Sequence, residues 1–574
     1  MAAAGMHDIR LREVFRWVGP ILGPEKNFFW LAIVYGVGIS VLSLATPLSV
    51  QLLINTIAST ALPAPLFTLA TVLFVLLLLS GALGVFRAHL MELFQRRFVA
   101  RLIADVTMKT INAANPFFQD ERRIDLFNRY FELINIQKTV PSLLIGGFAI
   151  ILQAAVGFIV TSFYHPFFLA FNMVVVALIW VVWLIWAPGA MKSSIVLSHQ
   201  KYYAAHWLES VGASNGFYKS SRHLDYAIEK SEEVSARYVA AHRLNYRYTL
   251  PQSIALVVLY AAASAGLLAL GGWLVIQEQL SIGQLVAAEL ILSGAFYGVS
   301  QLGTYLSNFY TLVASVEELA LLYAIPQEPA PEPGARPLVA RNAALGLANV
   351  RFEHVSGPVR FNLQIPEGAR LVAQGEPGME HEFSAMLKRL RKPDGGIITL
   401  GGVDIAAMDI LGLRSDIIVL DRPFIVESSI IDYLRLSSRE GDPAAILDAL
   451  RLVGLEDRIA MLPDGLQTRL SSTGWPLSLA KTMQLKLAAA VLSRPRILVL
   501  SPLFDVVTAG RLQAVFDHFA GTPTTVLYFS NRPEAVSLEG FLWLGRQQQA
   551  IVDDRAAFDA LRAGGEREDG RGGS

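Results

Sequence analysis

Six long apolar stretches dominate the first half of the chain, and they have no repeating polar face. Each holds the roughly 20 residues that an α-helix needs to cross the hydrocarbon core of a bilayer. A soluble amphipathic helix would show polar positions with a period near 3.6 residues, and these stretches do not. The pattern therefore predicts six membrane-spanning helices, at 28–54, 66–90, 142–163, 166–187, 250–275 and 284–315.

The connections between the stretches alternate between short segments and long basic ones. Segments 55–65, 164–165 and 276–283 contain no Lys or Arg, whereas 91–140 and 188–248 contain eight each. Lys and Arg accumulate in the cytoplasmic loops of membrane proteins. We therefore expect both termini and both long segments to be cytoplasmic, and the long segments to continue the spans as helices.

Three short segments interrupt these helical patterns. Pro116-Phe117-Phe118 and Asn215-Gly216-Phe217-Tyr218 lie near the midpoints of the long connections and predict chain reversals at their tips. Ala45-Thr46-Pro47 predicts a kink in the first span, because a proline removes one helical hydrogen bond.

Two charged residues fall inside the apolar stretches. Arg87 lies near the cytoplasmic end of the second stretch, and we expect its guanidinium to extend to the interface. Glu289 lies deeper, where facing lipid would cost a carboxylate roughly 2.5–3.5 kcal/mol or more. Two interpretations of Glu289 stay open, a hydrogen bond between helices and a role in a cavity that receives a substrate.

A proline-rich segment, 326–343, separates the apolar half from a second domain. Five of the twelve positions from 326 to 337 are proline, which predicts an extended spacer. Short β-branched runs then alternate with helical patterns over 344–560, which indicates an α/β domain. The Gly-rich, charged end, 561–574, predicts a disordered tail. Strands are expected at Arg370–Ala373, Ile417–Leu420, Arg496–Leu500 and Thr524–Phe529.

Composition and charge narrow the class of protein further. Apolar residues make up 53% of the chain and charged residues 17%, against about 25% charged in soluble proteins, so the chain is neither ordinarily soluble nor disordered. It has no cysteine, and its ten histidines show no metal-ligand spacing, so no metal site is expected. Basic and acidic residues balance at 48 each. We expect no nucleic-acid partner, and interpret the basic cluster Lys388–Lys392 as a solvated face or helix end.

The order of segments and three short motifs resemble one half of an ABC exporter. The motifs Thr46-Pro47-Leu48, Glu92 to Arg97 and Gly283-Gln284-Leu285-Val286 look like the hemolysin-type, type I secretion branch. The resemblance implies a multidomain membrane protein, with an all-α six-helix transmembrane domain over 1–325 and an α/β ABC-ATPase-like domain over 344–560. It also implies a bacterial inner membrane. Coupling contacts with ATPase domains would come from the two tips, at Phe117, Phe118, Phe217 and Tyr218.

The phosphate-binding loop of that family, GxxGxGK[ST], is altered in this chain. Its glycines free backbone N–H groups to bind phosphates, its lysine reaches the β- and γ-phosphates, and its hydroxyl holds magnesium. Gly375 and Gly378 match the first two glycines, but Glu380 replaces the third glycine, His381 the lysine and Glu382 the hydroxyl residue. A like-charge contact near 4 Å costs roughly 4 kcal/mol at an effective dielectric of about 20. We therefore expect neither ATP nor magnesium to be a cofactor.

Five further family motifs are altered as well. The two acidic residues that hold magnesium and polarise the attacking water are replaced, so phosphoryl transfer lacks its usual groups. Ser501 and Pro502 stand at the positions of the acidic pair. The signature motif keeps only Leu477-Ser478. Asp421 aligns with the coupling glutamine, Asn531 with the switch histidine, and His354 with the aromatic residue that stacks on adenine.

The resemblance and the altered motifs together favour a catalytically silent ABC exporter half. In the leading hypothesis this half pairs with an ATPase-competent second ABC half and forms the translocation pathway with it. The alternative is a homodimeric, non-pumping structural or regulatory membrane protein. A third hypothesis is an active transporter with unusual nucleotide chemistry. The type I secretion resemblance also implies peptide or protein export with a periplasmic adaptor as partner.

Overall fold

The computed structural model describes residues 11–59, 64–114, 127–328, 338–355, 357–438 and 442–569. The chain divides into two compact units, Met1–Glu328 and Pro329–Ser574.

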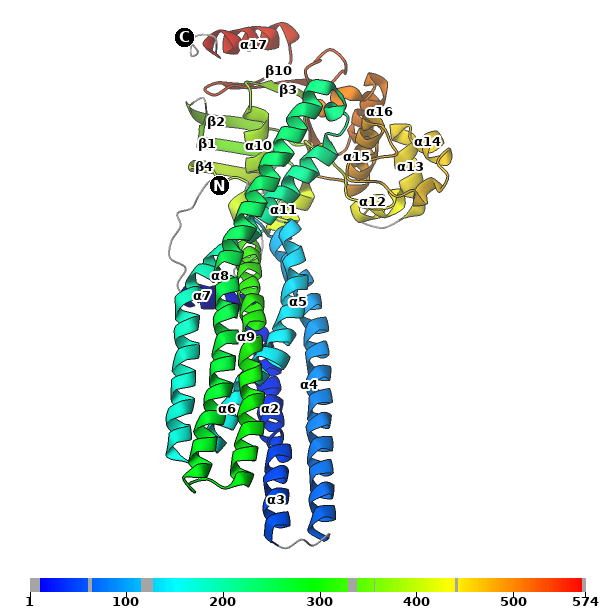
Figure 1. Cartoon of the computed structure of the whole chain (residues 1–574). Helices are drawn as coiled ribbons and strands as arrows, with labels where there is room; N and C mark the ends of the chain where they lie inside the picture. The colour runs from blue at the N-terminus through cyan, green and yellow to red at the C-terminus, as the bar shows by residue number, and fades with distance from the viewer. Residues whose placement is uncertain are drawn as a thin grey trace. The chain divides into compact units, whose positions relative to one another are not determined.

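The N-terminal unit is a bundle of long helices, in which α7, α8 and α9 run side by side (Figure 1). Six segments of the described residues are long and apolar enough to cross a membrane, which confirms the six predicted spans: Arg16–Asn55, Leu66–Ile111, Phe127–Ser162, Pro166–Ala213, Ser221–Ile276 and Ile282–Tyr323. The helices are α1 (Leu11–Leu22), α2 (Lys26–Leu42), α3 (Ala45–Ser59), α4 (Ala64–Ile111), α5 (Glu132–Ser142), α6 (Phe148–Ser162), α7 (Pro166–Ala213), α8 (Ser221–Ile276) and α9 (Ile282–Tyr323).

The long basic segments continue the spans as helices, as expected. Helices α4, α7 and α8 run without interruption from an apolar stretch into a basic one. Between α7 and α8 the chain reverses through the short helix η4 (Phe217–Lys219), which confirms the second predicted tip. The first tip, Pro116-Phe117-Phe118, lies outside the described residues.

The bundle contains two irregularities. The helix is interrupted between Leu42 and Ala45, next to the predicted kink at Pro47. A π-helical turn, η3 (Leu143–Gly147), joins α5 to α6 and was not predicted. The ring and hydroxyl of Tyr305 occupy the space that a Cβ on Gly146 would need, so this turn packs tightly against α9.

Arg87 does not extend to the interface, so the prediction for this residue was wrong. It is only 7% exposed, and among the described residues neither Nε nor Nη1 has a hydrogen-bond partner. The Nη1 atom would lie 3.5 Å from a Cβ on Gly36 of α2. The missing side chain of Gly36 thus leaves room for the guanidinium to pack between helices.

A buried carboxylate fastens α5, α7 and α9 together. Glu132 of α5 is 1% exposed. It accepts hydrogen bonds from the hydroxyl of Tyr202 at 2.8 Å and the amide of Asn135 at 2.7 Å. It also accepts the hydroxyl of Ser315 of α9 at 2.5 Å, and forms an ion pair with Lys201 of α7. Because every partner is a donor, the carboxylate is satisfied although it is buried.

The C-terminal unit is built on a mostly parallel six-stranded sheet, which confirms the α/β prediction. The strand order is β10-β9-β3-β8-β7-β6. A second, antiparallel sheet has the order β2-β1-β4-β5. The bounds are β1 (Leu345–His354), β2 (Gly357–Ile365), β3 (Arg370–Gly375), β4 (Gly395–Leu400), β5 (Val403–Asp404), β6 (Ile417–Leu420), β7 (Ile497–Leu500), β8 (Thr525–Phe529), β9 (Gly540–Leu544) and β10 (Gln549–Val552).

Helices cover both faces of the six-stranded sheet and form two cores. One core lies between the sheet and α12, α13, α15 and α16, and the other between the sheet, α10 and the antiparallel strands. The helices of this unit are α10 (Met379–Leu387), α11 (Ile410–Asp416), α12 (Ile430–Ser437), α13 (Pro443–Val453), α14 (Glu456–Ala460), α15 (Leu479–Ser493), α16 (Ala509–Phe519) and α17 (Arg555–Asp569).

Of the two segments expected to lack regular structure, the tail differs from the prediction, and residues 329–337 of the proline-rich segment lie outside the described residues. The start of the proline-rich segment belongs to the N-terminal unit, because the backbone N–H of Ala114 donates to the carbonyl of Pro326 at 2.8 Å. The expected tail, 561–574, is helical as far as Asp569, the end of α17. Buried Phe558 stacks on Phe541 of β9 at 5.0 Å between ring centroids, which anchors this helix to the sheet.

Candidate functional site

The loops that follow four parallel strands gather at one edge of the six-stranded sheet. Ligand sites of α/β proteins lie at this edge, outside the carboxyl ends of the strands. The topology brings five predicted positions, Gly375, Gly378, Glu380, Pro502 and Asn531, into one open cavity of about 440 Å³. Its other lining residues are Ala373, Gln374, Glu376, Pro377, Phe529, Ser530, Trp543 and Arg562.

The loop after β3 keeps the backbone shape that its glycines permit. Gly378 has a φ of 85°, in the left-handed region, and α10 begins at the next residue. A Cβ on Gly378 would lie 2.7 Å from Nε2 of His354, so this histidine packs directly against the loop. His354 thus lies beside the loop, as its predicted alignment requires.

A salt bridge holds the same loop from the other side. Nε of Arg546 lies 2.5 Å from Oε2 of Glu376, and the backbone N–H of Arg546 donates to Oε1 at 3.2 Å. The backbone N–H of Glu376 donates to the carbonyl of Leu544 in β9 at 3.0 Å. This N–H and the Glu376 carboxylate are therefore bound within the chain, and the sequence pattern carried no signal for either contact.

Two of the altered loop positions, His381 and Glu382, differ in exposure. His381 is exposed. Glu382 is partly buried and forms an ion pair with Arg391. The guanidinium of Arg391 lies 5.2 Å from the centroid of the Phe352 ring, which fixes its orientation. The carboxylate that replaces the magnesium-binding hydroxyl is thus neutralised inside the protein.

The basic cluster Lys388–Lys392 lies at the C-terminal end of α10, one of its two predicted interpretations, and it is not simply a solvated face. Arg389 donates to the carbonyl of Met408 at 2.8 Å, and Arg391 forms the ion pair with Glu382. Burial lowers the pKa of Lys388. The sequence pattern did not indicate these contacts, because they depend on how the chain folds back after α10.

Burial disfavours the ionised form of Glu380 in this cavity. Burial, with smaller contributions from Asp421 and Asp505, raises the pKa of Glu380 to about 7. A polyanion in the cavity would add a further charge beside Glu380, although Arg562 also lines the cavity.

The segments after β7 and β8 are joined by Asp505. Its carboxylate accepts hydrogen bonds from the hydroxyl of Ser530 at 2.8 Å and the backbone N–H of Asn531 at 3.0 Å, and also bonds Tyr528. Buried Ser501 begins the short helix η7 (Pro502–Val506) and accepts from the N–H of Leu503 at 3.4 Å. Sequence reasoning missed Asp505, because no family motif aligned with it.

The predicted signature position, Ser478, and the predicted coupling position, Asp421, do not line this cavity. Ser478 is exposed at the start of α15 and does not line the cavity. Asp421 begins the segment after β6, and Nζ of buried Lys486 holds this segment by donating to the carbonyl of Phe424 at 3.0 Å. Burial lowers the pKa of Lys486.

In the N-terminal unit, Phe217 and Tyr218 lie at the tip between α7 and α8. Phe217 is exposed and stacks on His223 at 4.0 Å, and Tyr218 contacts Trp207 edge-on. Their predicted coupling role stays a prediction, and Phe117 and Phe118 lie outside the described residues.

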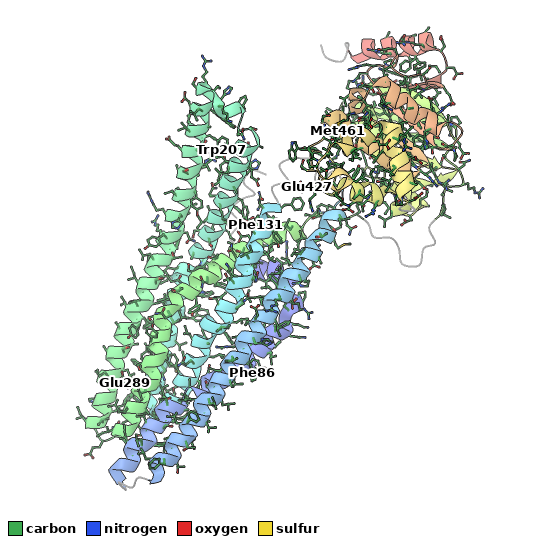
Figure 2. All side chains as sticks on the ribbon, turned by 90° about the vertical axis from the view of Figure 1, so that its right-hand side faces the viewer. Phe86, Phe131, Trp207, Glu289, Glu427 and Met461 are labelled. Atoms are coloured by element: carbon green, nitrogen blue, oxygen red, sulfur yellow. The ribbon has the colours of Figure 1, made fainter. Side chains whose placement is uncertain are left out.

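Glu289 lies on α9, toward the opposite end of the bundle from Trp207 (Figure 2). Its Oε2 atom is shielded from solvent and has no hydrogen-bond partner among the described residues. One interpretation of Glu289 was a hydrogen bond between helices, and among the described residues Oε2 has no donor for such a bond. Its role in a cavity stays a prediction.

The whole chain has the fold of an ABC exporter subunit, with a transmembrane domain and a nucleotide-binding-type domain. It matches the structure of a bacterial Atm1-family ABC exporter with ATP bound, with a TM-score of 0.78 and 18% identity. The match covers 93% of this chain and 96% of that one. No protein-family model matches the chain.

Relatives of this chain include type I secretion ABC proteins, in agreement with the predicted resemblance. The lactococcin-A transport/processing ATP-binding protein of Lactococcus lactis is 21% identical over 95% of this chain and 77% of its own length. The leukotoxin translocation ATP-binding protein of Mannheimia glucosida is 22% identical over 86% and 70%. The alpha-hemolysin translocation ATP-binding protein of Escherichia coli O157:H7 is 30% identical, over 42% of this chain and 34% of its own.

Proposed function

We propose that this chain is a catalytically silent half of an ABC exporter, which pairs with an ATPase-competent second half. The observation that carries this proposal is the state of the phosphate-binding loop. Glu380 and Glu382 stand where the loop would receive phosphates and magnesium, and Glu382 is already paired with Arg391. The residues present do not fit magnesium-ATP.

The segment after β7 supports the same conclusion. Ser501 and Pro502 offer no carboxylate to hold magnesium or polarise an attacking water. The nearby Asp505 carboxylate already accepts three hydrogen bonds within the chain. Phosphoryl transfer at this cavity would therefore lack both its metal ligand and its water-polarising group.

The role that remains for this half is structural and mechanical. It would supply six spans to the translocation pathway and coupling contacts through tips such as the one at Phe217 and Tyr218. The names of the relatives favour export of a peptide or protein. The secretion branch also favours a periplasmic adaptor and a bacterial inner membrane, with both termini cytoplasmic.

A homodimer that does not pump is the second candidate. The signature segment bears on this choice, because in ABC dimers the signature serine of one half contacts the nucleotide bound to the other half. Ser478 is exposed, as such a contact requires. However, exposed Leu479 and the adjacent Ala480 replace the two glycines that follow the serine. Their side chains would obstruct a close approach to the γ-phosphate, so even a shared site would be impaired.

Subunit composition separates the two candidates. The complex would be purified gently from its native membrane and weighed intact by mass spectrometry. A one-to-one complex with a second ABC chain is the expected result. Two copies of this chain alone would leave no intact ATP site and would favour the non-pumping homodimer.

Nucleotide binding by the chain itself is a separate test. A ligand that binds only the folded state raises the melting temperature, by an amount equivalent to about 2.7 kcal/mol at 100 times its Kd. We expect millimolar magnesium-ATP to leave the melting of this chain unchanged, while an intact ABC protein shifts. A comparable shift in this chain would favour an active transporter with unusual nucleotide chemistry.

A further inference from the structure

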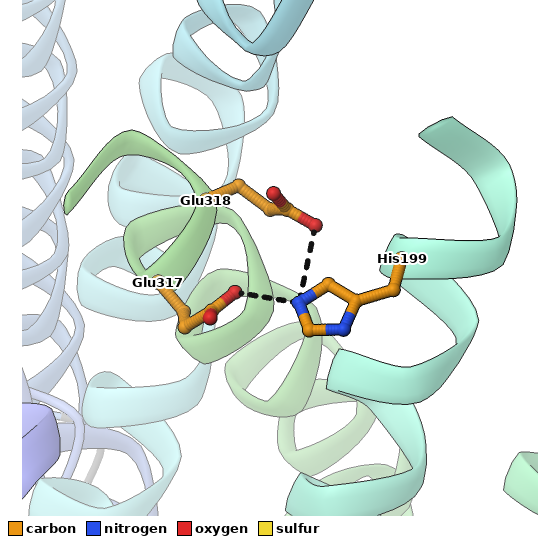
Figure 3. Close-up of side chains that lie close together, drawn as sticks. All are labelled: His199, Glu317 and Glu318. Atoms are coloured by element: carbon orange, nitrogen blue, oxygen red, sulfur yellow. Dashed lines mark hydrogen bonds and ion pairs between the residues drawn. The ribbon is translucent and has the colours of Figure 1, made fainter. Parts of the chain in front are cut away.

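A histidine and two glutamates meet between α7 and α9 of the N-terminal unit (Figure 3). Nε2 of His199 lies 3.2 Å from Oε2 of Glu317 and 3.7 Å from Oε1 of Glu318. One ligand atom from each residue lies within 4.8 Å of the others. The nucleotide-type cavity lies in the other unit and shares none of these residues.

The two distances from the histidine nitrogen suit a divalent transition metal, and the carboxylate oxygens lie within 4.8 Å of each other. Zn²⁺ binds imidazole nitrogen and carboxylate oxygen at about 2.0–2.2 Å, which places tetrahedral ligands roughly 3.3–3.6 Å apart. The two distances from Nε2, 3.2 and 3.7 Å, bracket that range. Calcium and magnesium prefer an all-oxygen shell of six or more ligands, so a site with one nitrogen favours a Zn²⁺-like ion.

A second observation is the orphaned oxygen of Glu318. This side chain is 0% exposed, and among the described residues its Oε1 atom has no hydrogen-bond partner. Oε1 faces Nε2 of His199, at a distance too long for a hydrogen bond (Figure 3). A buried, unsatisfied carboxylate oxygen is costly, so the cluster favours a positively charged occupant.

The surroundings orient the cluster and leave it accessible. The other oxygen of Glu318 forms an ion pair with Arg129, whose guanidinium lies 5.1 Å over the Tyr202 ring. Two carboxylates and one guanidinium leave a net charge of −1 when His199 is neutral. The His199 side chain is 48% exposed, which gives an ion a route of entry and a place for a water ligand.

We propose that His199, Glu317 and Glu318 bind one Zn²⁺-like divalent ion, which fixes the spacing between α7 and α9. Arg129 acts as the outer partner that holds Glu318 in its orientation, a role that tunes affinity in known metal sites. The ligands of α7 and α9 lie 118 residues apart in the sequence. The search for local histidine motifs therefore could not find them.

The test is metal binding by the full-length chain, purified with a histidine-free affinity tag and stripped with a chelator. Calorimetry with Zn²⁺ is expected to give one ion per chain with a Kd below about 10 µM. Co²⁺ in place of Zn²⁺ is expected to give visible absorption from a histidine–carboxylate site. No thiolate contributes to that signal, because the chain has no cysteine.

Variants assign the site. His199→Asn and Glu317→Gln are each expected to weaken binding at least tenfold, whereas His206→Asn, an exposed histidine of the same helix, should not change it. If His199→Asn fails to fold, the near-isosteric Glu317→Gln still carries the test. Absence of saturable binding below about 100 µM would overturn the proposal, as would an equal loss in His206→Asn. The occupant would then be a proton on His199.

Discussion

Two carboxylates of the altered loop have partners within the chain. Glu382, which replaces the hydroxyl residue, pairs with Arg391, and Glu376, at a variable position of the motif, pairs with Arg546. Partners of this kind stabilise the loop without a bound ligand. The altered residues are thus part of the folded structure of the domain.

Glu380 makes the stability of the C-terminal unit depend on pH. Its folded pKa of about 7 is above the value near 4.3 expected in an unfolded chain, so the folded state holds the proton more tightly. The contribution of Glu380 to stability should therefore be fully present below pH 4.3 and be lost as the pH rises through 7. Glu380→Gln should stabilise the chain less at pH 5 than at pH 8, where the gain should be about 1–2 kcal/mol after allowance for solvent screening.

Thermal melting at the two pH values measures this difference. Glu534→Gln, at an exposed carboxylate paired with Arg555, is the control and should change stability little at either pH. A stabilisation by Glu380→Gln that is equal at pH 5 and pH 8 would contradict the assigned pKa.

At the scale of elements, the sequence correctly predicted the helices and strands that depend on the local pattern of residues. The spans follow from apolar length, and β3, β6, β7 and β8 from short β-branched runs. Gly375, Pro502 and Asn531 were predicted from the motifs of the resembling family, and the structure brings them to one cavity. The failures share one cause, because each depends on tertiary packing that the local pattern does not show: Arg87 against Gly36, Arg391 paired with Glu382, Asp505 bonded to Asn531, and Phe558 packed on Phe541.

The Glu132 cluster should be the strongest single fastening among α5, α7 and α9. Glu132→Ala would leave the ammonium of Lys201 and the hydroxyl of Ser315 without their shared acceptor. The Lys201 side chain is 45% exposed and water can solvate its charge, so the main cost is the buried Ser315 hydroxyl left without an acceptor, about 1–3 kcal/mol. We expect a lowered melting temperature in detergent, whereas Glu92→Ala, at an exposed pair with Arg96, should cost less than about 0.5 kcal/mol. Equal effects would show that the cluster contributes no more than a surface pair.

At the scale of the whole molecule, the altered motifs can be tested separately. The combined variant Glu380→Gly, His381→Lys and Glu382→Ser restores the loop pattern but leaves Ser501 and Pro502 in place. It should gain magnesium-ATP binding, seen as a rise in melting temperature, without gaining ATP hydrolysis.

The unaltered chain and a variant with Ser501→Asp and Pro502→Glu alone are the matched controls. Neither should respond to nucleotide, because both keep the carboxylates in the loop. Hydrolysis by the loop variant would show that the segment after β7 is not needed for the chemistry.

The π turn at Leu143–Gly147 has a consequence for how the bundle tolerates change in chain length. A π turn contains one residue more than an α turn, and each residue rotates a helix by about 100°. The turn therefore sets the phase between the α5 face that carries Glu132 and the apolar face of α6. A single deletion there would leave a regular α turn with both faces still in their contacts, because the wider turn already takes up the extra residue, whereas a deletion within the regular helix of α5 or α6 would rotate one of these faces by about 100°. The π turn is thus the place in this helix pair where one residue can be lost without changing the phase between the Glu132 cluster and the membrane-spanning part.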